Sequence, residues 1–187
     1  ALHRLIVTSD TYRRSVRAPR SGAGDLDPDN RLLSHRNPIR LDAECVRDAM
    51  LLASGRLDLR MGGAGDMQFD LQPGIHVTPR VDYTRFDVDS AAGGRRSVYR
   101  FLFRTLPDPF MDALDCPAGD QLTAVRNNSV TVQQALALWN NAFVARQAEH
   151  VAARLESDPG TLEDRLQQAF LLTLGRAASS EELREWV

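Results

Sequence analysis

The sequence contains no lysine, so all 23 of its basic residues are arginine, and its formal net charge is −2. A small negative charge excludes the general electrostatic attraction that brings strongly basic proteins to nucleic acid or to anionic membranes. Long hydrophobic runs are also missing, because none approaches the roughly 18 apolar residues of a membrane-spanning helix. We therefore expect no nucleic-acid partner and no membrane span in these residues.

Cysteine is scarce, and its placement indicates neither a metal site nor a redox site. Cys45 and Cys116 are far apart in the sequence, and no histidine has the partner four residues away that a zinc-binding helix needs. The sequence leaves open whether the two cysteines form a disulfide. Cys45 lies on the apolar side of a predicted helix, which predicts a buried free thiol at that position.

The sequence does contain a series of helices with their start signals. Apolar spacing predicts helices at about 2–12, 42–54, 109–114, 131–155 and 161–174, and a further one that begins near residue 179. Thr131 and Gln134 have the spacing of a capping box, which satisfies two free backbone N–H groups at a helix start. Trp139 and Trp186 recur at helical spacing with other apolar residues, so we expect both to face the core, with a sugar-binding platform as the alternative.

Residues 60–94 differ from the helical segments around them. Turn signals such as Pro73-Gly74 and Gly93-Gly94 interrupt them, which predicts a loop insertion with short strands. Residues 96–105 are rich in aromatic and apolar side chains and are predicted to form a strand. The predicted class is therefore mainly α (α+β): a helical bundle-like domain with a small antiparallel β element around residues 74–105.

The length of the chain is that of one domain. We predict that residues 1–187 form a single domain, because most domains have 50–250 residues, as a rough range. Both ends of the sequence fall inside helical patterns, so we expect the chain to be a fragment of a longer domain or protein.

Several segments together, in this order, resemble a planctomycete-type domain of unknown function. They are LHRLIVTSDTYRRS (2–15), DPDNRLLSHRNPIRLDAECVRDAMLLASGRLD (27–58), RRSVYRFLFR (95–104) and RNNSVTVQQALALWNNAFV (126–144). That family forms the C-terminal region of large exported proteins that often carry a cytochrome c domain near the N-terminus. The resemblance implies an exported or periplasmic, multidomain bacterial protein whose partners are the other domains of the same polypeptide. The haem-attachment motif CxxCH is absent from this chain, so any haem is expected elsewhere in the full-length protein and no cofactor is expected here.

Two arginine-containing segments form a candidate anion-binding site. They lie where a strand and a helix are predicted to start, at which backbone N–H groups are free. Guanidinium groups bind carboxylate, sulfate or phosphate through two parallel hydrogen bonds. The alternative is that these arginines form internal salt bridges while the neighbouring side chains cap loop backbone. The candidate residues are Arg95, Arg96, Ser97, Arg126, Asn127 and Asn128.

Three alternating aspartates, Asp25, Asp27 and Asp29, are a candidate metal site because a calcium loop has similar spacing. An EF-hand would need glycine at position 30 and glutamate at position 36, where this chain has Asn30 and Arg36. The alternative is that the aspartates form side-chain-to-backbone turns.

Three functional hypotheses remain open from the sequence. The first is a non-catalytic structural or interaction module of an exported, cytochrome-c-linked protein. The second is part of an enzyme acting on polysaccharide, including sulfated glycans, whose arginines bind the anion. The third is a docking surface for a haem domain. There is no G-x-S-x-G nucleophile motif and no glycine-rich nucleotide-binding loop. Other catalytic arrangements need no such motif, and whether the chain is an enzyme stays open.

Overall fold

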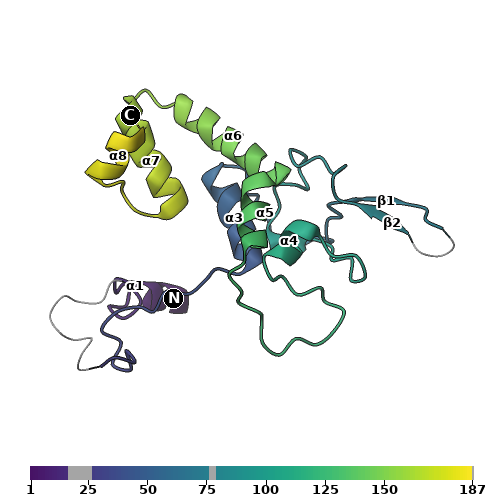
Figure 1. Ribbon diagram of the computed structural model, residues 1–187, viewed down its shortest axis with the longest axis horizontal. Coiled ribbons are helices and arrows are strands. Elements are labelled where there is room, and N and C mark those ends of the chain that lie inside the picture. The colour runs from purple at the N-terminus through teal and green to yellow at the C-terminus, as the bar shows by residue number, and fades with distance from the viewer. Residues whose placement is uncertain (17–26, 76–78, 187) are drawn as a thin grey trace. The chain divides into compact units, whose positions relative to one another are not determined.

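Figure 1 shows the computed structural model of the chain, which describes residues 1–16, 27–75 and 79–186. The chain divides into two compact units, Ala1–Arg40 and Leu41–Val187. The described residues form helices and one two-stranded antiparallel sheet, so the predicted mainly α class with a small sheet is confirmed. No helix in the described ranges is long and apolar enough to cross a membrane. That the whole chain is a single domain stays a prediction.

The described residues of the first unit contain one short helix and a turn organised by a buried asparagine. Helix α1 (Leu2–Thr8) ends earlier than predicted. Asn30 adopts a left-handed conformation with φ of 49°, and its side-chain amide donates to the carbonyl oxygen of His35 at 2.7 Å and to Asn37 at 3.0 Å. Asparagine tolerates this conformation better than most residues, which explains its place in the turn.

The other helices of the described residues lie in the second unit, and three of their ends follow the sequence signals. Thr131 and Gln134 form the predicted capping box, Thr161 and Asp164 form another, and Gly175 ends a helix with φ of 66°. These signals act between residues close in sequence, so they were predictable. The helices are α3 (Ala43–Ala53), α4 (Pro109–Ala113), α5 (Val132–Asn140), α6 (Ala142–Glu156), α7 (Leu162–Leu174) and α8 (Ser180–Trp186).

The predicted continuous helix 131–155 is wrong, because the chain turns a corner at Asn141. This residue ends α5 and begins α6, and its extended backbone has φ of −74° and ψ of 130°. Its side-chain oxygen accepts a hydrogen bond from the backbone N–H of Phe143 at 2.9 Å. Asparagine competes with the helix through such bonds, so the second helix starts with a new cap.

The core lies where α3, α4, α5 and α6 meet, in the middle of Figure 1. Phe110, Met111 and Leu114 are buried there with Ala43 of α3. Both cysteines are free. Cys116 is buried against this core, and burial, with the charge of Glu44 as a smaller cause, raises the pKa of its thiol to about 11. The prediction of a buried thiol at Cys45 is wrong, because Cys45 is exposed. The buried side of α3 consists of Ala43, Arg47, Leu51 and Ala53.

The prediction that the two tryptophans face the core is also wrong. Trp139 is 86% exposed and Trp186 is 68% exposed. Helix α5 packs its opposite side inward, where Ala137 and Leu138 contact the core and Gln134 is buried. A helix can bury one stripe only, so the stripe that contains Trp139 faces outward.

The sheet is a short hairpin that projects from the helices in Figure 1. Strand β1 (Asp70–Gln72) pairs antiparallel with β2 (Arg80–Asp82), with Leu71 opposite Val81. It begins before the predicted range of 74–105.

The predicted strand at 96–105 is wrong. The segment forms a short 3-10 helix, η1 (Ser97–Tyr99), and then only an isolated bridge between Asp66 and Arg100. The backbone N–H of Ser97 bonds the side chain of Asp48 on α3 at 2.8 Å, so it is unavailable to a neighbouring strand.

Candidate functional site

The first predicted anion-binding segment, residues 95–97, is built into the fold. Arg95 is buried, donates to the carbonyl oxygen of Gly62 at 2.7 Å and pairs with Asp66 at 3.1 Å. Arg95 and Arg96 both lie against the ring of Tyr99, with guanidinium carbons 4.0 and 5.4 Å from its centroid. These contacts agree with the alternative interpretation, in which the arginines form internal salt bridges.

The second segment, residues 126–128, also contacts α3. Arg126 binds both carboxylate oxygens of Glu44, at 2.7 and 2.9 Å, and this hydrogen bonding lowers the pKa of Glu44. Asn127 and Asn128 are exposed in the loop before α5. The two segments therefore contact different residues of α3, Glu44 for one and Asp48 for the other. Anion binding by these six residues stays a prediction.

The candidate metal site falls partly outside the described residues, since Asp25 lies there. Both carboxylate oxygens of Asp27 accept backbone N–H groups, from Arg31 at 2.9 Å and from Leu32 at 2.7 Å. This is the turn chemistry of the alternative interpretation. In the described ranges no group of three or more His, Cys, Asp or Glu side chains could hold a metal ion.

The structure instead brings polar groups together in a cleft of about 390 Å³ in the second unit. We call it the arginine cleft. Its charged lining consists of Arg47 of α3, Arg100 and Asp108, and the other sides are the loop after β2 and the first residues of α4 and α6. The cleft therefore has two cations and one anion in its wall.

Arg47 is the most deeply buried of these groups, with 4% of its surface exposed. One guanidinium nitrogen donates to the carbonyl oxygen of Arg95 at 2.9 Å, and the other donates to that of Gly93 at 2.7 Å. A Cβ atom at Gly93 would lie 2.3 Å from the carbonyl oxygen of Val88, so only glycine lets this loop fold so tightly. Arg47 thus ties the loop before η1 to α3.

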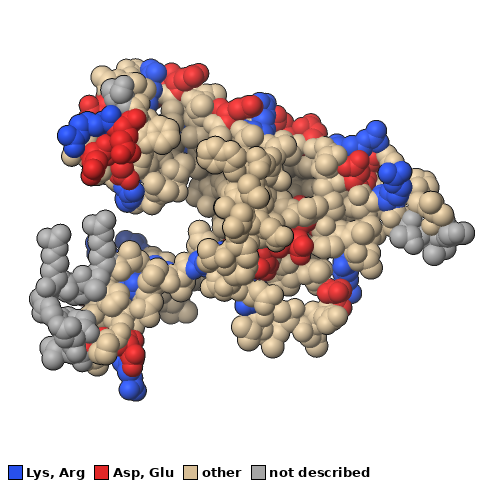
Figure 2. All heavy atoms as spheres, in the orientation of Figure 1, with Lys and Arg blue, Asp and Glu red and all other residues tan. Residues whose placement is uncertain are grey.

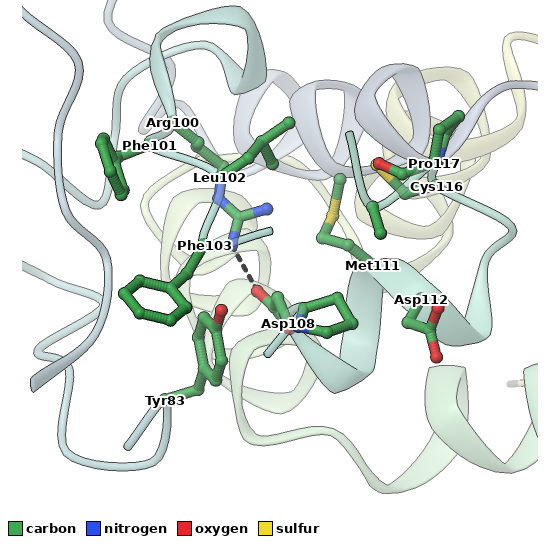
Figure 3. Close-up of a pocket in the computed structure, with 12 residues that line it drawn as sticks. Tyr83, Arg100, Phe101, Leu102, Phe103, Asp108, Met111, Asp112, Cys116 and Pro117 are labelled. Atoms are coloured by element: carbon green, nitrogen blue, oxygen red, sulfur yellow. Dashed lines mark hydrogen bonds and ion pairs between the residues drawn. The ribbon is translucent and has the colours of Figure 1, made fainter. Parts of the chain in front are cut away.

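Arg100 is the second buried cation, with 6% of its side chain exposed. Figure 3 shows its guanidinium turned toward Asp108, with which it forms an ion pair. The other oxygen of Asp108 caps α4 by accepting the backbone N–H of Phe110 at 2.8 Å. Arg100 also lines a small cavity of about 20 Å³ beside the cleft, bounded by Met111 and Cys116 among others (Figure 3). Its Nη1 atom is buried and has no hydrogen-bond partner among the described residues.

The two cations share one neutral acceptor. The side-chain oxygen of Gln68 accepts from Arg47 at 3.2 Å and from Arg100 at 2.7 Å. Burial, followed by the charge of Arg100, lowers the pKa of Arg47 to about 10. Arg47 remains charged at neutral pH, and its repulsion with the guanidinium of Arg100 would be relieved by a further negative charge.

A helix start adds to the positive potential of the cleft. The 15-residue helix α6 begins at the cleft with Asn141, Ala142 and Phe143 among the lining residues. The N-terminal end of a helix carries a partial positive charge from its free N–H groups. The arrangement can accommodate an anion, and the aromatic rings of Phe86, Phe110 and Phe143 can contact an apolar or ring-shaped body.

A different surface of the second unit is apolar and exposed. Val132, Leu136 and Trp139 lie three and four residues apart, on one side of α5, and all are exposed. Val125 and Val130 in the preceding loop are exposed as well. In Figure 2 the area over α5 and this loop carries few charged side chains. We call these five residues the α5 face.

Comparison with protein families gives a match that extends over the whole chain. A family model described as PSD1, a protein of unknown function (DUF1553), matches residues 1–187. The chain belongs to the PSD1 family. No curated protein and no solved structure matches it significantly. Membership confirms the predicted domain of unknown function.

The cleft residues of this PSD1 chain were not predicted from the sequence. Arg47 did carry a signal, because it stands between Ala43 and Leu51 at four-residue spacing on the inward side of α3. A charged residue on such a stripe indicates a buried and paired group. Arg100 and Asp108 carry no such signal, since only the folded loop brings them to Gln68.

A polar cluster around Asp89 joins the loop after β2 to α6 of the PSD1 domain. Asp89 accepts hydrogen bonds from Arg146 and from His150, each at 2.7 Å. Arg56 donates to the backbone carbonyl oxygen of Asp89 at 2.6 Å. The bonds from Arg146 and, second, from His150 lower the pKa of Asp89 to about 2.

We predict that Asp89 makes folding stability depend on pH in the acid range. Its pKa in the folded protein lies below the value of about 3.9 in an unfolded chain, so its pairs stabilise the fold above about pH 4 and this contribution is lost as the pH falls toward 2. The stability difference between the wild-type protein and Asp89→Asn should therefore shrink between pH 5 and pH 3 in urea titrations.

The matched control is Asp120→Asn, in the loop between α4 and α5, for which the described part of the chain shows no ion pair or hydrogen bond. Its stability difference from the wild-type protein should be small throughout. A difference for Asp89→Asn that stays constant over this range would contradict the assignment.

Proposed function

We propose that this PSD1 domain is a non-catalytic interaction module that docks through the α5 face onto another domain of the same polypeptide. The observation that carries the proposal is the exposed stripe of Val132, Leu136 and Trp139. Exposed, contiguous apolar surface on a folded domain marks a contact site more often than it serves the fold itself. Tryptophan in particular is enriched among the residues that dominate binding energy at interfaces.

The inner side of α5 supports the same proposal. Gln134 faces inward and donates to Asp115 at 3.0 Å and to Ser129 at 2.8 Å, so it is held by the second unit itself. Ala137 and Leu138 pack on the core from the same side. The orientation of α5 is thus fixed by its inner contacts, and the outward stripe contributes to none of them. A partner with an apolar surface would bury it.

The partner follows from the resemblance to exported multidomain proteins. In such a protein the domains share one polypeptide, and linkage raises their effective concentration to the millimolar range as an order of magnitude. A modest apolar patch then suffices for docking. A cytochrome-c-type domain is one such neighbour, and export of the protein belongs to the same proposal.

Side-chain oxidation by hydroxyl radicals tests the proposal in the full-length polypeptide. Trp139 should be oxidised rapidly in residues 1–187 alone and be protected in the full-length protein, because docking would cover it. Trp186, which is exposed on α8, serves as the internal reference. Equal oxidation of Trp139 in both proteins would contradict the proposal. Protection that appears in residues 1–187 alone, and grows with concentration, would show that a second copy is the partner instead.

A substitution then measures what Trp139 contributes. Replacing an interface tryptophan by alanine commonly costs at least about 2 kcal/mol, or roughly a thirtyfold loss of affinity. We expect Trp139→Ala to weaken binding between residues 1–187 and the separately produced remainder of the polypeptide by this factor in calorimetry. Trp186→Ala is the matched control and should leave the affinity unchanged. The same loss from both substitutions would place the contact elsewhere.

A further inference from the structure

We propose that the arginine cleft binds a small organic carboxylate with a ring-shaped body, a function separate from docking through the α5 face. The cleft has the volume for such a molecule, about 390 Å³, and pockets of roughly 300–1,000 Å³ are usual for small ligands. Its wall combines cations, amides and aromatic rings.

The charge of the lining selects an anion over a cation. Arg47 and Arg100 face one lining carboxylate, Asp108, whose two oxygens already accept Arg100 and the backbone N–H of Phe110. The carboxylate nearest Arg47 is Asp48 at 3.5 Å, and its Oδ1 atom accepts the backbone and hydroxyl groups of Ser97. The protein's own carboxylates are therefore engaged, and the lining itself carries two guanidinium groups and one carboxylate.

The donors that a ligand could reach come from two places. The guanidinium of Arg100 contributes charge rather than a free donor, because its unpartnered Nη1 atom is itself buried. The first turn of α6 lines the cleft with Ala142, whose backbone N–H stands beside that of Phe143, which Asn141 caps. Asn140 at the rim is exposed and makes no side-chain hydrogen bond within the described ranges. Together they suit the two oxygens of a carboxylate.

The body of the ligand would lie against aromatic rings. Phe110 and Phe143 pack with ring centroids 6.0 Å apart, and Phe86 lines the cleft as well. The guanidinium carbon of Arg47 lies 5.2 Å from the centroid of Phe143, so charge and apolar surface are adjacent. A ring bearing a carboxylate matches both surfaces, which a bare inorganic anion does not.

Binding is tested on the whole chain with paired probes. Benzoate is compared with benzamide, and glucuronate with glucose, so that each carboxylate has an uncharged counterpart of the same size. At least one carboxylate should bind about tenfold more tightly than its counterpart in calorimetry or ligand-detected NMR, a difference of about 1.4 kcal/mol. Equal binding within both pairs would overturn the proposal. Inorganic sulfate that competes as strongly as the carboxylates would overturn the choice of a ring-bearing ligand.

The location is tested by a charge at the rim, because Arg47 and Arg100 hold the fold and are unsuitable for substitution. Asn140→Asp should weaken carboxylate binding about tenfold, since a negative charge near another is unfavourable in a partly buried site. Gln121→Glu adds the same charge in the exposed loop before α5 and should leave affinity unchanged. Unchanged affinity in Asn140→Asp, with the fold verified by circular dichroism, would overturn the site.

Discussion

Replacing Arg47 by alanine is expected to lower the free energy of unfolding by about 3–5 kcal/mol, as removal of a buried charged partner usually does. The substitution leaves the carbonyl oxygens of Gly93 and Arg95 without the Arg47 donor, while the side-chain oxygen of Gln68 keeps only its bond from Arg100. Each buried acceptor without a partner costs about 1–3 kcal/mol. The loop before η1 also loses its main attachment to α3.

The measurement is urea or thermal unfolding followed by circular dichroism. For a chain of this size each kcal/mol lowers Tm by about 2–4 °C, so the expected shift is large. The control is Arg85→Ala, because Arg85 is 60% exposed and its ion pairs with Asp70 and Asp82 lie at the surface. Such pairs contribute about 0–1 kcal/mol. Similar losses from both substitutions would show that Arg47 does not hold the loop.

Leu51→Ala is the second substitution with a large expected effect. Leu51 is fully buried on α3, with 0% of its surface exposed. Its removal leaves a cavity that the surrounding side chains cannot fill completely, and comparable changes cost about 2–5 kcal/mol. Equilibrium unfolding in urea should show this loss as a lower midpoint with an unchanged slope.

The neighbouring Leu52 provides the matched control for this substitution. It lies on the same helix and is 61% exposed, so Leu52→Ala removes the same atoms without opening a cavity. Surface changes of this kind usually stay within about 0.5 kcal/mol. Equal losses at the two positions would contradict the inward orientation assigned to α3.

Local signals made the helix starts predictable. Thr131 with Gln134, and Thr161 with Asp164, act over three residues through their own side chains and backbone. The same local chemistry also explains the break at Asn141, which hydrogen-bonds the N–H of Phe143. This break was not predicted, because the apolar residues on both sides of Asn141 continue the helical spacing.

The candidate anion site shows why pairing could not be read from the sequence. Arg95 and Arg126 are found beside Asp66 and Glu44, which lie 29 and 82 residues away along the chain. Spacing along a chain does not reveal which carboxylate meets which guanidinium. The predicted strand at 96–105 does not form for a similar reason, because Asp48 of α3 accepts the hydrogen bond from the backbone N–H of Ser97.

The sequence by itself determined the mainly α class, the capping boxes of α5 and α7 and the membership of the PSD1 family. All three depend on residue types and on contacts over a few residues. Only the tertiary structure decided which side of α5 faces outward, so that Trp139 is exposed while Gln134 is buried. It also decided that Arg47 and Arg100 meet at Gln68. Both outcomes depend on packing between segments that are distant in the sequence. Burial of one surface leaves another exposed, and no local sequence pattern indicates which of the two is buried.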